Sequence, residues 1–241
     1  MSKYLRILVV SEMARPDKGS SMLKWIGSAD DDYLAARQLL LTNSLVKGSS
    51  LSNTAIEKYL KAFLIHLDLK IPKGYKGHNI ANLYKQIKEN GIDLGLNEDY
   101  LALLFKAYRL RYPDGLESGF NVALCGIKLL VELDHTVYDV REGIRFEKNG
   151  KKVTTEIQRL QERKNPILLD KNCYYGCCDR AVLFNQGSTY YEFRIVGKDI
   201  PIEASIYRPI VVDDGKFGVE ALKPNSKGGY DLAEWLGEPT K

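Results

Sequence analysis

The sequence predicts an α+β protein, with an N-terminal all-α bundle of antiparallel, up-and-down helices and a smaller β-rich C-terminal domain. Apolar residues recur at helical spacing from about Asp30 to Gly143, which predicts amphipathic helices that bury one face. After Gly143 the pattern changes to short alternating runs separated by Gly, Pro and Asp, which is typical of strands and turns. Helices followed by strands favour segregated α and β parts.

The composition of the 241 residues indicates the class of protein. Hydrophobic residues make up 44% and charged residues 27%, as in ordinary soluble domains. No apolar run approaches the roughly 20 residues that cross a bilayer. Residues 4–10 are apolar but too short and too interrupted for a signal-peptide core. We therefore expect a cytoplasmic protein that has no contact with a membrane.

The formal net charge of +4 is spread evenly along the chain, so any grip on nucleic acid must rest on a local patch. The richest stretch runs from Arg145 to Lys164 and has seven basic and three acidic side chains. We interpret it as a solvated linker surface, and a phosphate contact is the alternative.

The helical pattern predicts five helices, at about residues 30–47, 49–70, 79–89, 97–111 and 117–141. Asp30 to Asp32 form an N-cap and an acidic first turn, which suit the helix dipole. Tyr112-Pro113 ends the fourth helix, because proline disfavours helix at the preceding residue. Short connections between the helices favour antiparallel neighbours.

The chain divides into four parts: an N-terminal segment at 1–24, the bundle at 25–143, a connector at 144–165 and the small β-rich domain at 166–241. In the connector, Lys148 to Lys151 predicts a hairpin turn, and Glu156 to Lys164 predicts a helix. The β-rich domain is expected to have strands near 181–184, 189–196, 200–212 and 217–222.

Four cysteines are present. Cys125 lies in an apolar helical run and is expected in the core. Cys173, Cys177 and Cys178 form a cluster that is compatible with a metal site or with free thiols in a reducing compartment. Zinc sites usually need a second ligand pair, and no Cys-x-x-Cys or His pair follows. We therefore expect free thiols, and we assign no metal and no cofactor.

Four motifs follow one another in the bundle. They are Trp25-Ile-Gly-Ser-Ala-Asp-Asp-Asp-Tyr-Leu-Ala-Ala-Arg37, Ala55-Ile-Glu-Lys-Tyr-Leu-Lys-Ala-Phe-Leu64, Lys76-Gly-His-Asn-Ile-Ala-Asn-Leu83 and Tyr108-Arg-Leu-Arg-Tyr-Pro-Asp114. In these motifs, and over residues of about 25–143, the chain resembles the HEPN (higher eukaryotes and prokaryotes nucleotide-binding) family. The resemblance implies a helical bundle, frequently a homodimer, with a cleft for nucleotides or RNA.

Many HEPN members are metal-independent ribonucleases with an arginine followed four to six positions later by a histidine. The three histidines here are His66, His78 and His135, and none follows an arginine at that spacing. Cleavage by a 2′-hydroxyl needs a base near neutrality beside a cation. We therefore expect binding without cleavage, and a ribonuclease toxin that uses His78 or His135 is the alternative.

A related family arrangement pairs the bundle with a minimal nucleotidyltransferase. Lys47-Gly48-Ser49-Ser50 has the Gly and Ser of the transferase turn but no Asp-x-Asp downstream, and we interpret it as a turn between two helices. A transferase or an antitoxin would then be a separate chain. A third hypothesis makes this protein an interaction subunit of a toxin–antitoxin or defence-type complex.

Six residues are candidates for ligand binding. Arg37 lies about 40° from Tyr33 on the helical wheel, so it either forms a buried salt bridge or reaches a cleft. Arg111 lies at the end of its helix, beside Arg109. It either neutralises the helix dipole or joins Arg37 in a phosphate pocket.

For each of the other three candidates, a structural role and a role in ligand binding are both open. Lys58 points to solvent or to the cleft edge. His78 is expected to open the third helix, where it caps the helix, contacts Asp68 or contacts the ligand. Tyr112 either packs the turn or stacks on a base, as aromatic side chains do in RNA sites.

Overall fold

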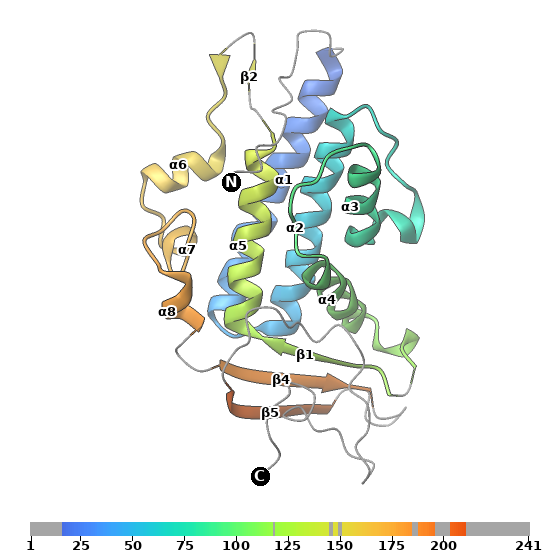
Figure 1. Cartoon of the computed structure of the whole chain (residues 1–241), viewed down its shortest axis with the longest axis vertical. Coiled ribbons are helices and arrows are strands. Elements are labelled where there is room, and N and C mark those ends of the chain that lie inside the picture. Colours follow the sequence, from blue (N-terminus) through green and yellow to red (C-terminus); the bar gives the residue numbers. More distant parts are fainter. Residues whose placement is uncertain are drawn as a thin grey trace.

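The computed structural model describes residues 16–117, 119–144, 147–148, 151–184, 188–195 and 203–210. Helices make up most of the described residues, and a three-stranded sheet lies across one end of the bundle (Figure 1). This arrangement confirms the α+β class with a helical N-terminal region. In the described ranges, no helix combines the length with the hydropathy that a membrane span needs.

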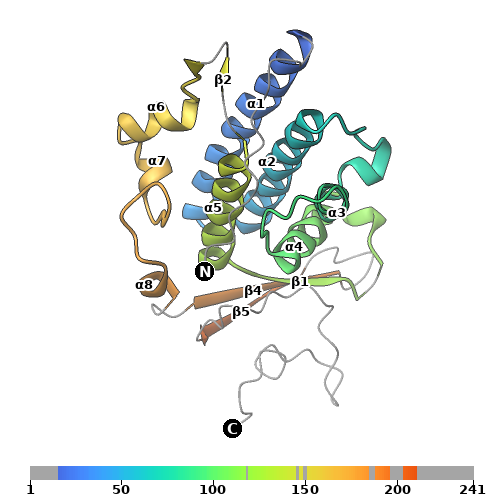
Figure 2. The same cartoon turned by 45° about the horizontal axis from the view of Figure 1, so that its top comes forward.

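Five helices form the bundle. They are α1 (Pro16–Leu41), α2 (Leu45–His66), α3 (Ile80–Glu89), α4 (Glu98–Tyr108) and α5 (Gly126–Glu142). Helix α2 is central, because it packs against each of the other four. Figure 2 shows α1 and α5 on one side of α2 and the shorter α3 and α4 on the other. The predicted set of five helices is confirmed in number and order within the bundle.

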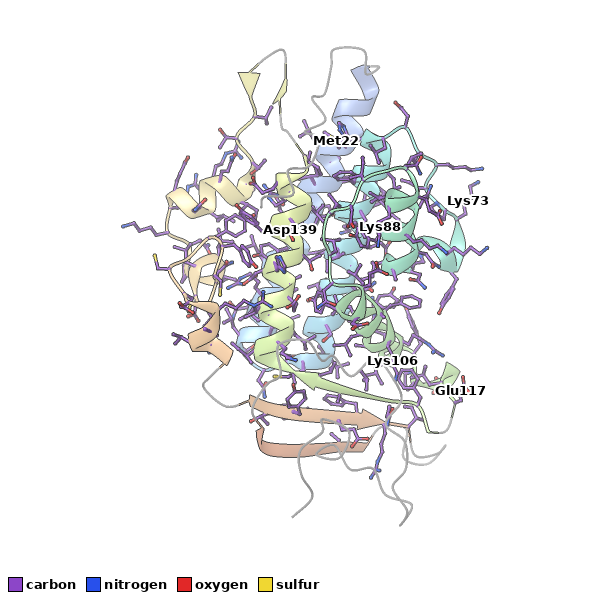
Figure 3. All side chains as sticks on the ribbon, viewed as in Figure 1. Met22, Lys73, Lys88, Lys106, Glu117 and Asp139 are labelled. Carbon is purple, nitrogen blue, oxygen red and sulfur yellow. The ribbon has the colours of Figure 1, made fainter. Side chains whose placement is uncertain are left out.

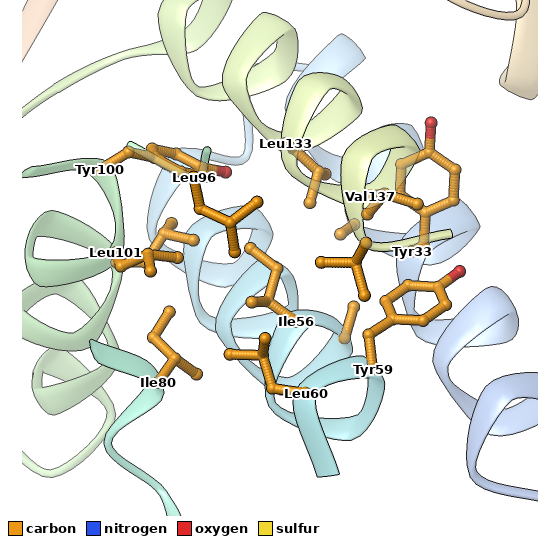
Figure 4. Packing of buried hydrophobic residues seen from close by; sticks show 14 of the residues in the cluster. Tyr33, Ile56, Tyr59, Leu60, Ile80, Leu96, Tyr100, Leu101, Leu133 and Val137 are labelled. Atoms are coloured by element: carbon orange, nitrogen blue, oxygen red, sulfur yellow. The ribbon is translucent and has the colours of Figure 1, made fainter. Parts of the chain in front are cut away.

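The core is centred on the apolar stripe of α2. Ile56 and Leu60 of α2 lie between Leu101 of α4 and Val137 of α5 (Figure 4), and all four are 0% exposed. Burying one such side chain contributes about 1.5–3 kcal/mol to the free energy of unfolding. The apolar periodicity of the sequence therefore identified the core face of this helix correctly.

Helix α1 begins earlier than predicted. It starts at Pro16, a residue that suits the first turn of a helix, and its buried stripe includes Met22 and Ile26 upstream of Tyr33. Asp30 is not an N-cap, because it is 1% exposed and its carboxylate binds Arg141. The acidic run was a misleading start signal, since one of its members faces the core.

The predicted turn at Gly48 is also wrong, because Gly48 lies in the first turns of α2. The chain reverses earlier, where Asn43 has a positive φ of 61°. A Cβ atom on Gly48 would lie 2.7 Å from Cδ2 of Leu40. Glycine at this position therefore permits the close approach of α1 and α2.

The predicted helix at 117–141 is split into strand β1 (Asn121–Cys125) and helix α5. All five residues of β1 are buried, including Cys125, which is in the core as expected. A short apolar run fits a buried strand as well as a buried helix. The partner strand, β4 (Ser188–Arg194), decides between them by supplying backbone hydrogen bonds.

The sheet has the order β1-β4-β5, and both pairs are antiparallel. Strands β4 and β5 (Glu203–Ile210) confirm the strands predicted near 189–196 and 200–212. In the register, Val122 lies opposite Phe193, and Phe193 lies opposite Ala204. The sheet therefore joins the two halves of the chain across the boundary predicted at residue 166.

The predicted strand near 181–184 is instead the short helix α8 (Arg180–Phe184). Asp179 Oδ1 accepts hydrogen bonds from the backbone nitrogens of Ala181 at 2.7 Å and Val182 at 3.3 Å, which is the geometry of a helix N-cap. The apolar run from Ala181 to Phe184 alone fits a strand as well as a helix, and the cap by Asp179 favours the helix.

The connector contains the expected hairpin, with β2 (Glu147–Lys148) paired to β3 (Lys151–Lys152). The expected helix is α6 (Glu156–Glu162), which begins with a capping box of Thr155 and Gln158. A further short helix, α7 (Pro166–Leu169), follows. The strand expected near 217–222 lies outside the described residues.

The cysteines Cys125, Cys173, Cys177 and Cys178 are all free. In the described part of the chain, no three His, Cys, Asp or Glu side chains are grouped so as to hold a metal ion.

Candidate functional site

Arg37 extends from α1 into the interior, where Asp134 of α5 matches its charge. The side chain is 0% exposed, and Nη1 forms a salt bridge with Oδ2 of Asp134. Its Nε donates to the carbonyl oxygen of Ile167 at 2.8 Å, and its Nη2 donates to that of Asp170. Every nitrogen of the guanidinium thus has a protein acceptor. This is the buried salt bridge that the sequence left open as one of two interpretations, and it gives Arg37 no solvent-facing surface.

Tyr33 and Asn172 complete the network around this ion pair. The hydroxyl of Tyr33 donates to Oδ1 of Asp134 at 2.8 Å and accepts from Nδ2 of Asn172 at 3.2 Å. Burial raises the pKa of Asp134 to about 6, although Arg37 lowers it. Because Ile167, Asp170 and Asn172 all take part, the network ties the chain after α6 to the bundle.

A second buried network has the same design. Nη1 of Arg141 in α5 pairs with Oδ1 of Asp30 in α1, and the Tyr59 hydroxyl also donates to that oxygen. Nη2 of Arg141 donates to Oγ1 of Thr155 at 2.6 Å, which fixes the start of α6. Both networks are structural, since their charged atoms are satisfied within the protein.

Lys58 lies on the side of α2 that faces α1. Its Nζ is 2.6 Å from Oδ2 of Asp32 and 2.8 Å from Oγ of Ser28. The ammonium group is therefore neutralised by a half-buried carboxylate, and no ion pair or hydrogen bond found among the described residues joins it to Arg109 or Arg111, which follow α4. The structure does not bring Lys58 together with Arg109 or Arg111.

His78 follows η1 (Gly74–Gly77), just before α3, and it is held by a buried carboxylate. Its Nδ1 is 3.1 Å from Oε2 and 3.2 Å from Oε1 of Glu57. Glu57 also accepts from Nζ of Lys61 at 2.6 Å. The side chain of His78 is 51% exposed, so its ring is oriented by Glu57 and faces solvent on its other edge.

The end of α4 carries the remaining candidates. Helix α4 passes into η2 (Arg109–Arg111), and η3 (Pro113–Gly115) follows Tyr112. Cζ of Arg109 lies 5.1 Å from the ring centre of Phe120. Cζ of Arg111 lies 5.1 Å from the ring centre of Tyr108 and 5.7 Å from that of Tyr112. Tyr112 itself is 61% exposed.

Neither Arg109 nor Arg111 has a carboxylate partner within ion-pair distance among the described residues. Each guanidinium is held against aromatic rings by cation–π contact, which orients the group without occupying its N–H donors. Carboxylate and phosphate oxygens are the usual partners of such donors. The N–H donors of the two arginines are therefore available to bind an anion from solvent.

Tyr75 of η1 extends this surface towards α3. Its ring, 65% exposed, meets that of Phe105 at 5.3 Å between centres, in an edge-to-face arrangement. Phe105 precedes Arg109 by one turn of α4, and Nζ of Lys106 lies 5.6 Å from the ring centre of Phe120. These contacts form three groups around the end of α4: Tyr75 with Phe105, Lys106 and Arg109 with Phe120, and Arg111 with Tyr108 and Tyr112. We call these eight residues together the basic aromatic surface.

The charge around this surface is positive. Residues 70–78 add three lysines and no carboxylate, and Lys73 and Lys106 lie on the same side of the molecule as Glu117 (Figure 3). Residues 105–117 carry three cations, Lys106, Arg109 and Arg111, and two carboxylates, Asp114 and Glu117, so cations outnumber anions in this segment. An anionic ligand is therefore favoured over a cationic one.

The structure thus brings Arg111 together with Tyr112 and places Arg109 against Phe120, whereas Arg37 and Lys58 are paired with carboxylates elsewhere. Sequence reasoning missed Tyr75, Phe105 and Phe120, which carry no chemical signature of their own. One signal was present: Phe105 and Arg109 are four residues apart on a helix, and such pairs lie on one face.

His135 of α5 belongs to a different cluster. Its Nε2 is 2.9 Å from Oδ2 of Asp139, its ring stacks on Tyr174 at 5.4 Å, and Glu132 lies nearby with Arg180 at 2.8 Å. The hydrogen bond to Asp139 is the largest effect that raises the pKa of His135, to about 9. A protonated imidazole is a poor general base at neutral pH.

Comparison with known proteins supports the resemblance seen in the motifs. The family model described as HEPN domain matches residues 22–146, which extends from within α1 to just beyond the end of α5. No curated protein and no solved structure matches the chain. The matched region contains the basic aromatic surface and both buried arginines, whereas α6, α7, α8, β4 and β5 lie beyond it.

Proposed function

Because this chain belongs to the HEPN domain family, we propose that it binds a nucleotide or an RNA phosphate through the basic aromatic surface, as a binding module and not as a nuclease. One observation carries the proposal. Arg109 and Arg111 lie against aromatic rings, and no carboxylate of the described residues pairs with them.

The chemistry of the guanidinium group supports a phosphate as the ligand. A guanidinium is planar and offers N–H donors in a fixed fork that matches two oxygens of a phosphate. Stacking on Tyr108 and Tyr112 restricts the plane of Arg111 before the ligand arrives. This restriction lowers the entropy that binding must remove.

Binding without cleavage follows from the distribution of the histidines. None of the eight residues of the basic aromatic surface is a histidine, and no histidine follows an arginine at the spacing of the family nucleases. The raised pKa of His135 leaves it protonated near neutrality. His78 lies close in sequence to Tyr75, so a ribonuclease that uses His78 is the alternative that the test must include.

We further propose a cytoplasmic homodimer that forms through the bundle helices. A separate nucleotidyltransferase or antitoxin chain is the partner to expect if the protein acts within a toxin–antitoxin complex. Light scattering on the purified chain tests the dimer, and co-purification with the product of a neighbouring gene tests the partner.

The binding proposal is tested by titrating fluorescein-labelled RNA, and separately a fluorescent adenosine nucleotide, with wild type and Arg111→Ala. We expect Arg111→Ala to lose about 1–3 kcal/mol, or about 5- to 150-fold in affinity, the scale of a lost hydrogen bond to a charged group. Arg163→Ala is the matched control, because Arg163 is exposed and lies in the basic connector. A loss in Arg163→Ala alone would assign binding to the connector, and equal losses in both variants would indicate general charge attraction and not a site at Arg111.

The same samples separate the alternatives. If the wild type has no affinity for RNA or for the nucleotide, the proposal is wrong, and a co-purifying chain would then favour an interaction subunit. If labelled RNA is cut, and His78→Ala abolishes the cutting without changing affinity, the protein is a ribonuclease.

A further inference from the structure

A histidine–glutamate pair joins α2 to the start of α3 and lies outside the basic aromatic surface as defined above. His78 ends η1, and Glu57 belongs to α2. Both carboxylate oxygens of Glu57 are near the same ring nitrogen, since Nδ1 of His78 is 3.1 Å from Oε2 and 3.2 Å from Oε1. The side chain of Glu57 is 9% exposed and that of His78 is 51% exposed. A buried carboxylate therefore holds a solvent-facing imidazole by one of its two nitrogens.

The contact with Glu57 fixes which nitrogen of His78 carries the proton. An ionised carboxylate only accepts hydrogen bonds, so Nδ1 is the donor, and the lone pair of the neutral ring lies on Nε2. Among the described residues, no hydrogen bond or ion pair is found at Nε2. The nitrogen that carries the lone pair is therefore open to a reactant from solvent.

Glu57 is itself held by a second charged side chain. Nζ of Lys61, one turn later in α2, is 2.6 Å from Oε1 of Glu57. The same ammonium group lies 5.5 Å from the ring centre of Trp25 in α1, and Lys61 is buried. The carboxylate is therefore fixed beside the imidazole before any reactant arrives, and its charge is partly balanced.

An imidazole held in this way suits nucleophilic attack. Histidine forms covalent intermediates through a ring nitrogen. When Nε2 attacks, the proton stays on Nδ1, so the ring gains a positive charge that faces Glu57 at hydrogen-bond distance. This attraction between opposite charges is absent in the neutral histidine, so the carboxylate stabilises the product more than the reactant.

The surroundings of His78 favour an anionic reactant. Lys70, Lys73 and Lys76 lie in the segment that leads to His78, and all three are exposed. Residues 70–78 contain no carboxylate. Such an excess of positive charge raises the local concentration of small anions, which favours a phosphoryl donor over a neutral electrophile.

We propose that His78 is a phosphoryl-acceptor site, which takes the group from a small phosphoryl donor with a good leaving group. Nε2 attacks the phosphorus atom and an N–P bond forms, while the bond from phosphorus to the leaving group breaks and its electron pair departs with that group. The proton remains on Nδ1, bound to Glu57. Glu57 is a positioning residue, because it acts through the imidazole. This activity goes beyond the proposed function and does not depend on it, because His78 is not a member of the basic aromatic surface.

The test treats the full chain with potassium phosphoramidate, from which ammonia leaves, and follows the rate at each histidine by mass spectrometry of the intact protein and its peptides. Loss of the added group in mild acid, but not in alkali, identifies phosphohistidine. The variants are His78→Gln and Glu57→Gln, and circular dichroism confirms that each is folded.

His66 and His135 are internal controls in every sample. His135 is a matched control because carboxylate oxygens lie 2.9 Å from its Nε2 and 3.9 Å from its Nδ1, so both of its nitrogens face anions. We expect His78 of the wild type to react first, and we expect His78→Gln to lose this fast reaction.

Glu57→Gln should slow the reaction at His78 by about 10- to 100-fold, the scale on which loss of a carboxylate that orients a histidine changes activity. The rates at His66 and His135 should not change. If Glu57 only stabilised the fold, its replacement would loosen the bundle and raise the rates at the other histidines instead.

The proposal is wrong if His78 of the wild type reacts no faster than His66 and His135, and this comparison decides the claim even if Glu57→Gln does not fold. It is also wrong if a folded Glu57→Gln reacts at the wild-type rate. Neither result concerns the affinity for RNA or a nucleotide, so this claim and the binding proposal fail separately.

Discussion

The buried pair of Arg37 and Asp134 predicts two variants that respond differently to pH. Asp134→Asn leaves Arg37 as a buried cation that cannot release its proton. Its Nε and Nη2 still bind the carbonyl oxygens of Ile167 and Asp170, so the charge stays inside the bundle. Removing one partner of a buried ion pair costs about 3–5 kcal/mol, and the stability of Asp134→Asn itself should not depend on a titration at residue 134, because asparagine has no titratable group.

Arg37→Met leaves a carboxyl group that a proton can neutralise. Burial already raises the pKa of Asp134 from 3.8 to about 6 against the effect of Arg37, so removing Arg37 raises it further. Protonating a carboxyl group above its unfolded pKa of 3.8 costs about 1.4 kcal/mol for each pH unit. At pH 7 this cost is about 4 kcal/mol, and it is the upper limit of the stability that Arg37→Met loses through the unpaired Asp134. At pH 5 the same bound is about 2 kcal/mol.

The direction follows from proton linkage. The folded-state pKa of Asp134 in Arg37→Met lies above the unfolded value, so the folded variant binds more protons. Its stability is therefore greatest at low pH and is lost as the pH rises through the folded pKa. Between pH 7 and pH 5 the stability of Arg37→Met should rise by about 2–3 kcal/mol and that of the wild type by about 1 kcal/mol, because its own Asp134 has a pKa of about 6. Asp134→Asn lacks this carboxyl group and should show no such gain.

Urea unfolding followed by circular dichroism at pH 5 and pH 7 measures these differences. The double variant Arg37→Met/Asp134→Leu should regain most of the lost stability, because an apolar pair of similar size can replace a buried ion pair. Losses below about 1 kcal/mol, or equal and pH-independent losses in the two single variants, would refute a buried structural pair.

Two further predictions concern packing and pH. Gly48→Ala should cost about 1–3 kcal/mol in unfolding free energy, since its Cβ would meet Cδ2 of Leu40 at 2.7 Å; Gly27→Ala, with no atom within 4 Å of its Cβ, is the control and should gain roughly 0.5–1 kcal/mol. Asp139 is the main cause that raises the pKa of His135 to about 9. The protonated imidazole should therefore stabilise the fold fully below pH 6.5, and about 1 kcal/mol of unfolding free energy should be lost as the pH rises through 9. Parallel pH profiles of wild type and His135→Gln in urea unfolding would contradict the second prediction.

The sequence predicted the bundle well because helical burial repeats within a short window. The apolar stripe that includes Ile56 and Leu60 identifies the buried face of α2 from its own sequence. The start of α3 is also set by nearby residues, since the side chain of Asn79 accepts a hydrogen bond from the backbone nitrogen of Asn82 at 3.2 Å. The β1 segment failed for the opposite reason. Residues 121–125 read equally well as helix or strand until β4, more than sixty residues later, supplies the hydrogen bonds.

The candidate site was predictable only in part, since charge pairing is not written in local sequence. Arg37 was recognised as an arginine on a buried face, but its counter-ion lies 97 positions away. Arg111 and Tyr112 were identified together because they are adjacent. Tyr75 was not identified, because it reaches the end of the bundle through its packing on Phe105, a contact between η1 and α4 that no periodic pattern specifies.

The claim that Arg109 and Arg111 form the anion-binding surface is tested most directly by the salt dependence of binding. The measurement compares the affinity of wild type and of Arg109→Ala/Arg111→Ala for single-stranded RNA over a range of salt concentrations. Loss of two phosphate contacts should lower the slope of log affinity against log salt by about 1.4, at about 0.7 per contact. An unchanged slope and an unchanged affinity would contradict the account.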